Sequence, residues 1–233
     1  MPEGLIIETP PFDAYEQMAA DELLCDALRS PYTLRFYDWR EPGITFGYSQ
    51  KIASVKAAVG AQRADIKALV RRPTGGGIVF HESDLTFSFI FYQPGTYFEP
   101  AKTYDRLHRA LTGAYEKAGV GFELLNARTA DYRTNDPALD CFAKPVNLDI
   151  LYNGKKVLGG ALRKFGDYML YQASLQAPDS GTNAGFHRNM VIKALGEEFS
   201  LVWRSVGFSG IELEKVKTLV LSKYGAKEWN ERI

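Results

Sequence analysis

Apolar and polar residues alternate along some stretches of this chain and recur at helical spacing along others. From Leu85 to Phe91 every second residue is leucine or phenylalanine, with Thr86 and Ser88 between them, which predicts a half-buried strand. From Tyr104 to Ala118 apolar residues recur every three or four positions, and a glycine follows, which predicts an amphipathic helix. His108 falls on the apolar face of this helix, where a buried, hydrogen-bonded histidine is more common than a catalytic one.

The same patterns predict the other elements of one α+β domain. An earlier helix begins with the capping-box pattern of Asp13 and Glu16, and a short helix follows at Ile52–Gln62. Strands are predicted at Thr33–Trp39, Gly43–Tyr48, Ile66–Val70, Ile78–Phe80, Gly121–Leu125, Val146–Tyr152 and Tyr168–Gln176. Residues 126–139 are polar and predict a loop. We expect a central mixed or antiparallel sheet flanked by helices, in a single domain over residues 1–233, with C-terminal helices at 188–230 packed on it.

Asn153-Gly154 is the strongest hairpin signal in the chain, because this pair suits a two-residue turn. Such a turn places Tyr152 opposite Lys155 and Leu151 opposite Lys156. Lys156 then shares a sheet face with Asp149, at a diagonal Cα separation of about 7–8 Å. Lys155 is expected on the opposite face.

Two arginines, Arg71 and Arg72, enter a turn made by Gly75, Gly76 and Gly77. Glycines allow another molecule to approach the main chain closely, and successive amide groups in such a loop can hold an anion or a carbonyl oxygen. The loop is neither a P-loop, since no Gly-Lys-Ser/Thr ends it, nor a dinucleotide fingerprint, since a strand follows it. A hairpin with two exposed arginines is the alternative.

Composition narrows the functional classes. The chain has 233 residues, 45% apolar and 24% charged, with 28 basic and 28 acidic side chains. This balance gives no reason to expect nucleic acid or a membrane surface as a partner. No apolar run is long enough to span a membrane, and residues 1–13 lack the features of a signal peptide. Two cysteines, Cys25 and Cys141, are too few for a disulfide framework, so we expect a reduced, cytoplasmic protein. Cys25 lies within the first helix, where a buried structural thiol is expected.

Five blocks carry a resemblance to a known family: Met18–Leu24, Leu34–Tyr37, Gly47–Gln50, Arg71–Gly77 with His81, and Gly154–Ala161. In order and over about two thirds of the chain, they resemble the biotin/lipoate protein ligase superfamily, in its lipoate branch. The resemblance implies a tunnel for a medium-chain acyl group. It also implies transfer of octanoyl or lipoyl to a lysine of lipoyl domains, those of oxo-acid dehydrogenase E2 subunits and the glycine cleavage H protein. The residues it places at the substrate are Arg71, Arg72, Gly75, Gly76, Gly77, His81, Asp149, Gly159, Gly160 and Ala161.

Two branches of the family differ in chemistry. Octanoyltransferases take octanoate from acyl carrier protein through a cysteine thioester, and Cys141, next to Phe142 and 15 residues before Lys156, resembles their pattern. Lipoate ligases use ATP and Mg²⁺ to form an acyl-adenylate, and Gly77 and Asp149 resemble that branch. In a ligase Asp149 would hold the metal, whereas a transferase needs no metal or cofactor. Gln172 departs from both branches, which usually have histidine there.

The transferase interpretation is chemically coherent. Only a thiolate attacks a thioester well, and a nearby ammonium favours the thiolate and stabilises a tetrahedral oxyanion. Cys141 as nucleophile and Lys156 as that ammonium are therefore the predicted catalytic residues, and acyl transfer would run in two steps. The ligase, a non-catalytic acyl-binding module and a cysteine-histidine hydrolase are the alternatives.

Overall fold

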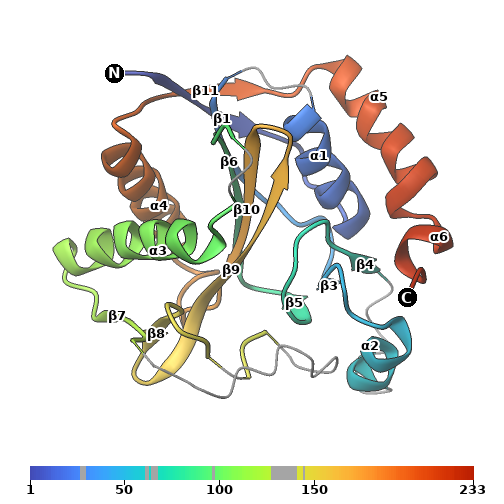
Figure 1. The fold of residues 1–233 in the computed structure, drawn as a ribbon, viewed down its shortest axis with the longest axis horizontal. Coiled ribbons are helices and arrows are strands. Elements are labelled where there is room, and N and C mark those ends of the chain that lie inside the picture. Colours follow the sequence, from blue (N-terminus) through green and yellow to red (C-terminus); the bar gives the residue numbers. More distant parts are fainter. Residues whose placement is uncertain (27–29, 61–62, 64–67, 96–97, 127–140, 144) are drawn as a thin grey trace.

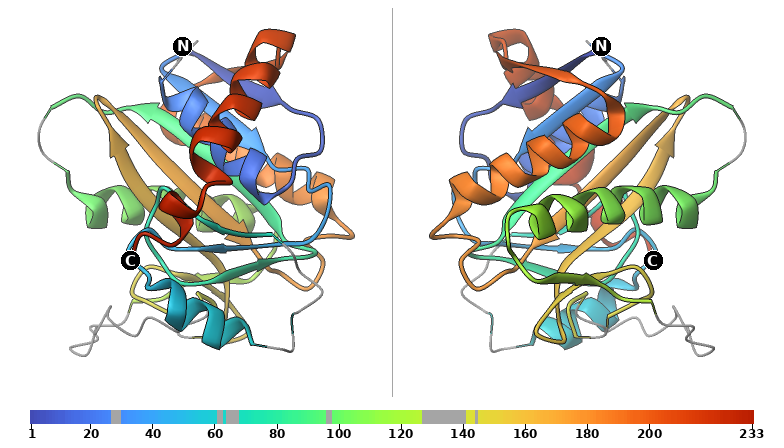
Figure 2. Two further views of the ribbon diagram at one scale, coloured as in Figure 1. Left: turned by 90° about the vertical axis from the view of Figure 1, so that its right-hand side faces the viewer. Right: turned by 90° about the vertical axis from the view of Figure 1, so that its left-hand side faces the viewer.

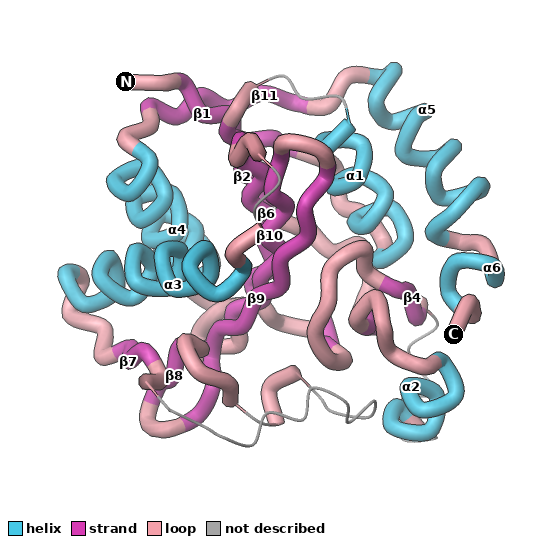
Figure 3. The backbone as a smooth tube through the Cα atoms, viewed as in Figure 1, coloured by secondary structure: helices cyan, strands magenta, loops and turns pink. Residues whose placement is uncertain are grey.

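A large mixed sheet runs through the centre of the protein, with a second, smaller sheet beside it (Figures 1 and 3). The strand order is β11-β1-β2-β6-β10-β9-β8-β7 in the large sheet and β4-β3-β5 in the small one. The structure is a computed structural model, and it describes residues 1–233 except 27–29, 61–62, 64–67, 96–97, 127–140 and 144. The predicted fold class, α+β with a mixed sheet flanked by helices, is confirmed.

The strands are β1 (Glu3–Glu8), β2 (Tyr32–Phe36), β3 (Gly43–Phe46), β4 (Leu69–Arg71), β5 (Val79–His81), β6 (Leu85–Tyr92), β7 (Phe122–Leu124), β8 (Ile150–Tyr152), β9 (Lys155–Phe165), β10 (Tyr168–Leu175) and β11 (Val202–Gly207). The helices are α1 (Ala14–Asp26), α2 (Ile52–Val59), α3 (Pro100–Lys117), α4 (Ala184–Phe199), α5 (Gly210–Leu219), the π-helical segment η2 (Val220–Tyr224) and α6 (Lys227–Asn230). Among the described residues, no helix is both long and apolar enough to cross a membrane.

Helices cover both faces of the large sheet. Figure 2 shows α3 and α4 on one face and α1 with α5 on the other. The alternating apolar residues of β6, among them Phe87 and Phe89, pack in the core with residues of α3 and α4. The polar residues between them face the other way but are also buried, with Thr86 4% and Ser88 1% exposed. The prediction of a half-buried strand is therefore wrong, because α1 and the small sheet cover the polar face.

Local signals in the sequence placed several elements correctly. Asp13 and Glu16 form the capping box of α1, each side chain accepting the other residue's N–H at 2.9–3.0 Å. The Asn153-Gly154 turn has positive φ at both residues, 51° and 74°, and pairs Tyr152 with Lys155 as predicted. The buried thiol of Cys25 in α1 is confirmed. The predicted loop at 126–139 falls almost wholly outside the described residues.

The strand predicted at Val146–Tyr152 starts later than expected, and two strands were not predicted. Residues 146–149 form a turn, because the Asp149 carboxylate accepts the Val146 N–H at 2.6 Å and Leu148 takes a φ of 73°. Strand β8 therefore begins only at Ile150. The missed strands, β1 and β11, pair in parallel at the edge of the large sheet.

The C-terminal residues are hydrogen-bonded to β4, the strand that leads to the glycine loop. The Arg71 guanidinium donates to the main-chain oxygens of Tyr48, Gln50, Trp229 and Asn230, and the Arg71 N–H donates to Asn230 Oδ1 at 2.8 Å. Arg71 is fully buried. Its charge therefore organises the C-terminus.

We predict that Asn230→Ala lowers the free energy of unfolding by about 1–3 kcal/mol, because it leaves the buried Arg71 N–H without a partner. The Asn230 side-chain amide also donates to the main-chain oxygens of Tyr224 and Ala226. Urea unfolding measures the change. Glu228→Ala, at an exposed position of the same short helix, is the matched control and should change stability by less than about 0.5 kcal/mol. Equal effects at both positions would contradict this role for Asn230.

Candidate active site

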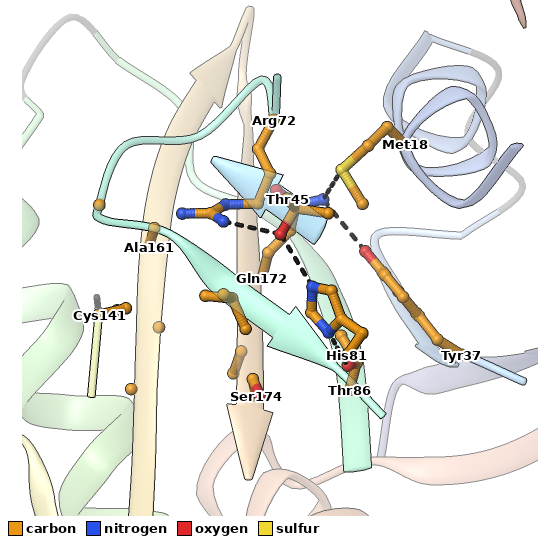
Figure 4. A pocket seen from close by; sticks show the side chains of 15 residues that line it. Met18, Tyr37, Thr45, Arg72, His81, Thr86, Cys141, Ala161, Gln172 and Ser174 are labelled. Atoms are coloured by element: carbon orange, nitrogen blue, oxygen red, sulfur yellow. Dashed lines mark hydrogen bonds between the residues drawn. The ribbon is translucent and has the colours of Figure 1, made fainter. Parts of the chain in front are cut away.

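A pocket lies between strands β9 and β10, the segment from Arg72 to His81, and helix α1 (Figure 4). About 420 Å³ of space lies within its outline, open solvent at its entrance included. Its lining residues are Met18, Tyr37, Thr45, Arg72, Gly76, Val79, His81, Thr86, Cys141, Gly159, Gly160, Ala161, Gln172, Ala173 and Ser174. Figure 4 shows Cys141 at one side of the pocket and Met18 with Tyr37 at the opposite side.

The Cys141 thiol has the Lys156 ammonium as a charged neighbour. The Lys156 Nζ lies 3.7 Å from the Cys141 Sγ and 2.8 Å from Asp149 Oδ2. The side chains of Lys156 and Asp149 are 3% and 0% exposed. Burial lowers the pKa of Lys156. The negative charges that Cys141 and Asp149 can carry raise this pKa by more than burial lowers it, so it lies above its ordinary value. Lys156 is therefore a cation at neutral pH, held between a thiol and a carboxylate.

An irregularity in the hairpin directs Lys156 to this place. Leu151 pairs with Lys156 but Ile150 pairs with Leu158, so Val157 is an extra residue in β9. Val157 and Leu158 are both buried in the core beneath α3 and α4, and the alternation of faces restarts after them. Gly159 consequently lies against Lys156, and a Cβ at Gly159 would come within 2.4 Å of Lys156 Cε. Lys155, which the hairpin register predicts on the opposite face from Lys156, is exposed.

The Asp149 carboxylate has protein partners at both oxygens. Oδ1 accepts the Tyr104 hydroxyl at 2.7 Å, and Oδ2 accepts the Val146 N–H and the Lys156 ammonium. The Tyr104 oxygen in turn accepts the Gly160 N–H at 3.1 Å. A divalent cation at Asp149 would have to compete with the Lys156 ammonium for this carboxylate, which does not favour a metal site there.

His108 supports the turn that carries Asp149. Burial lowers its pKa to about 3, so the ring is neutral at physiological pH. The Leu148 carbonyl only accepts, so Nδ1 carries the proton and donates to it at 2.7 Å, while Nε2 accepts the Tyr171 hydroxyl at 2.7 Å. His108 is therefore a buried, fully bonded structural histidine, as expected from its place on the apolar face.

Arg72 stabilises the glycine loop by donating hydrogen bonds to carbonyl oxygens of the loop. Its guanidinium donates to the oxygens of Gly75 and Gly77 and to the Thr45 hydroxyl, at 2.7–3.0 Å. Burial lowers the pKa of Arg72, while the negative charge that Cys141 can carry opposes that shift. Gly76 has a φ of 92°. It packs against Gly47, and a Cβ added to Gly47 would come within 1.9 Å of the Gly76 oxygen. The loop thus needs glycine at both positions.

His81 is fixed in the wall by bonds at both ring nitrogens. Nε2 lies 2.8 Å from the Thr45 hydroxyl and Nδ1 lies 2.9 Å from Asp84 Oδ2, and the ring stacks on Trp39. The hydroxyls of Thr86 and Ser174 donate to the same Asp84 oxygen. These polar groups are therefore bonded to one another, except for Asp84 Oδ1, which is buried and has no hydrogen-bond partner among the described residues.

The structure divides the predicted site residues into four groups. Arg72, Gly76, His81, Cys141, Gly159, Gly160 and Ala161 line the pocket. Lys156 and Asp149 lie behind Cys141 and Gly159, while Gly75 and Gly77 shape the loop without lining the pocket. Arg71 points away to the C-terminus, because its backbone lies in β4 and the loop begins after it. Met18, Tyr37, Thr45 and Tyr104 were not predicted, and they lie 37 or more residues away from Cys141 in the sequence.

These features define an α+β protein with a thiol–ammonium pair beside a carbon-lined pocket. The family model of the lipoyl protein ligase A/B catalytic domain matches residues 13–178, and the chain belongs to that family.

Individual relatives agree with this assignment. The octanoyltransferase LipM of Carboxydothermus hydrogenoformans is 30% identical over 169 residues, which are 70% of this chain and 61% of that protein. The LipM of Symbiobacterium thermophilum is 32% identical over 69% of this chain and 60% of its own length. The chain thus spans about 60% of these relatives. A structure of lipoate-protein ligase A bound with ATP has a TM-score of 0.79 at 21% identity, covers 99% of both chains, and shows the same fold.

We predict that Gly159→Ala slows alkylation of Cys141 by iodoacetamide at neutral pH by about threefold or more, because the new methyl displaces the Lys156 ammonium, which lies 3.7 Å from the Cys141 sulfur. Mass mapping of the labelled peptide measures the rate at Cys141. Gly113→Ala in α3, where a Cβ meets nothing within 4 Å, is the control and should leave the rate unchanged. An unchanged rate in Gly159→Ala would separate Lys156 from the reactivity of the thiol.

Proposed function

We propose that this protein is an acyltransferase that moves octanoyl from acyl carrier protein, through a thioester on Cys141, to a lysine of lipoyl domains. The observation that carries the proposal is the Lys156 Nζ at 3.7 Å from the Cys141 Sγ, at one side of an apolar pocket. An enzyme that binds an acyl group without attaching it to itself does not need the thiol. The LipM relatives support the same assignment.

The reaction runs in two acyl transfers. In the first, the Cys141 thiolate attacks the carbonyl carbon of the donor thioester, the donor's C–S bond breaks, and the donor thiolate leaves and takes up a proton. In the second, the lysine amine of the lipoyl domain attacks the Cys141 thioester, loses a proton and forms an amide, and Cys141 leaves as thiolate. The Lys156 ammonium stabilises the sulfur anion at the start and end of this cycle and the oxyanion between.

The glycine loop and β9 would hold the acyl group. Gly76 of the loop and the run from Gly159 to Ala161 line the pocket next to Cys141, and small residues there let the chain approach the backbone. Arg72 and His81 are assigned the support of the loop and wall. We place these residues in the binding of the octanoyl or lipoyl group, and Cys141 and Lys156 in catalysis.

Partners, location and organisation are part of the proposal. The donor is acyl carrier protein, and the acceptors are lipoyl domains of the glycine cleavage H protein or of oxo-acid dehydrogenase E2 subunits. The enzyme would work in the cytoplasm, as one catalytic domain over residues 1–233. It would need no metal or nucleotide, because the thioester donor is already activated.

The alternative is an ATP-dependent lipoate-protein ligase, and the structural likeness to lipoate-protein ligase A bound with ATP favours it. A ligase would require Mg²⁺ at a carboxylate such as Asp149. Both oxygens of Asp149 are engaged by Tyr104, Val146 and Lys156, which weighs for the transferase.

We predict that octanoyl-acyl carrier protein adds one octanoyl group to the protein, on Cys141, and that hydroxylamine removes it as expected of a thioester. Intact-mass and peptide-mass measurements detect the adduct. Cys141→Ala should fold and form no adduct. Cys25→Ala, which removes the buried thiol of α1, is the control and should still be acylated. Acylation at another residue, or of Cys141→Ala, would rule out this mechanism.

A further inference from the structure

The side of the pocket opposite Cys141 ends at two side chains, Met18 of α1 and Tyr37 after β2 (Figure 4). Both are buried, with Met18 1% and Tyr37 4% exposed. An acyl chain attached to the Cys141 sulfur and extended along β9 and β10 would therefore meet these two residues with its last carbons. The position of this wall then limits the length of chain that the pocket holds.

The wall is fixed by a buried hydrogen-bond network behind it. Asp21 of α1 accepts the Tyr37 hydroxyl and, at 2.8 Å, the side-chain amide of Gln172. The Gln172 amide nitrogen also lies 3.1 Å from the Tyr37 oxygen and 3.5 Å from the Met18 sulfur. If the side chain of Tyr37 or Gln172 rotated to make room for a longer acyl chain, it would break a hydrogen bond to the buried Asp21 carboxylate.

Further bonds fix the carboxylate and the amide at the centre of this network. Arg35 and Ser88 donate to Asp21 Oδ1, and Arg35 and Asp21 form a fully buried ion pair at 2.6 Å. The Thr74 hydroxyl donates to the Gln172 carbonyl oxygen at 2.7 Å. Met18 is bound to this wall only through its sulfur and its packing, so it is the member whose size can change while the network stays intact.

The chemistry of the wall also selects the end of the chain. The donors of Gln172 and Tyr37 are directed at Asp21 and at one another, so no free donor meets the terminal carbon. A hydroxyl or carboxylate at that end would be buried without a partner, which is unfavourable.

We infer that Met18, backed by Tyr37 and Gln172, sets the acyl-chain length that this enzyme accepts and restricts it to chains with an apolar end. The inference rests on the proposed function for the identity of the acyl donor, and on the pocket alone for the position of the wall. The physical basis is that one methylene more or less in a closed apolar pocket changes discrimination by about 10–200-fold.

The experiment measures how fast Cys141 is acylated by straight-chain acyl-pantetheine thioesters of increasing length. In Met18→Ala the longest chain accepted should increase, and the rate ratio of the first rejected chain to the best chain should rise about tenfold or more. In Met18→Phe the limit should move to shorter chains. A thioester whose chain ends in a carboxylate should react more slowly than the plain chain of the same length.

Met169→Ala is the matched control. Met169 is fully buried like Met18, but it lies on the opposite face of β10, in the core under α3 and α4. Both alanine variants lose core packing, so a loss of stability does not distinguish them, whereas only Met18→Ala should change the length profile. An unchanged profile in both folded Met18 variants would overturn the inference.

Binding of free fatty acids separates this inference from the proposed function. Any fatty acid that binds the folded state raises the melting temperature of the protein. Thermal shifts measured with fatty acids of increasing length therefore report the same length limit without any thioester chemistry. If no thioester acylates Cys141 but the binding limit moves in Met18→Ala, the proposed function fails and the inference stands. If acylation occurs and neither profile moves, the inference fails and the function stands.

Discussion

The buried ammonium of Lys156 is the constraint on which the site depends. Moving a charge out of water costs several kcal/mol per ion, and the attraction of a partner offsets this only with good geometry and further hydrogen bonds. Asp149 supplies the opposite charge at 2.8 Å, and Tyr104 and the Val146 N–H satisfy the rest of its carboxylate. The positive φ of Leu148, the extra residue Val157 in β9 and the missing side chain of Gly159 all serve this arrangement. The Lys156 ammonium is thereby held beside the Cys141 thiol and away from solvent.

A second buried ion pair stabilises the other side of the pocket in the same way. Arg35 and Asp21 lie between the large sheet and α1, and Ser88, Tyr37 and Gln172 complete their bonds. A fully bonded polar layer is stiff, because displacing any member leaves a buried group unpaired. The pocket between the two networks thus has a mainly apolar lining backed by bonded polar residues. Glutamine at position 172, where the family usually has histidine, is therefore accommodated by hydrogen bonds from its amide to Asp21 and from Thr74.

Local patterns in the sequence predicted those parts of the fold that depend on neighbouring residues. The hairpin register around Asn153 and the capping box at Asp13 follow from a few adjacent side chains, and both are confirmed. The strands β1 and β11 could not be predicted this way, because they pair in parallel across almost 200 residues. The burial of Thr86 and Ser88 depends on α1 and the small sheet, which pack against that face only in the folded chain. For the same reason, two adjacent arginines took different roles, Arg72 at the loop and Arg71 at the C-terminus.

The most direct test of the account is the mass of a lipoyl domain after incubation with this protein and each acyl donor in turn. If the thiol–ammonium pair performs the chemistry, octanoyl-acyl carrier protein alone modifies the domain, without ATP or Mg²⁺, and Cys141→Ala abolishes the modification. Modification only by free octanoate or lipoate with ATP and Mg²⁺, undiminished in Cys141→Ala, would contradict the account and establish a ligase.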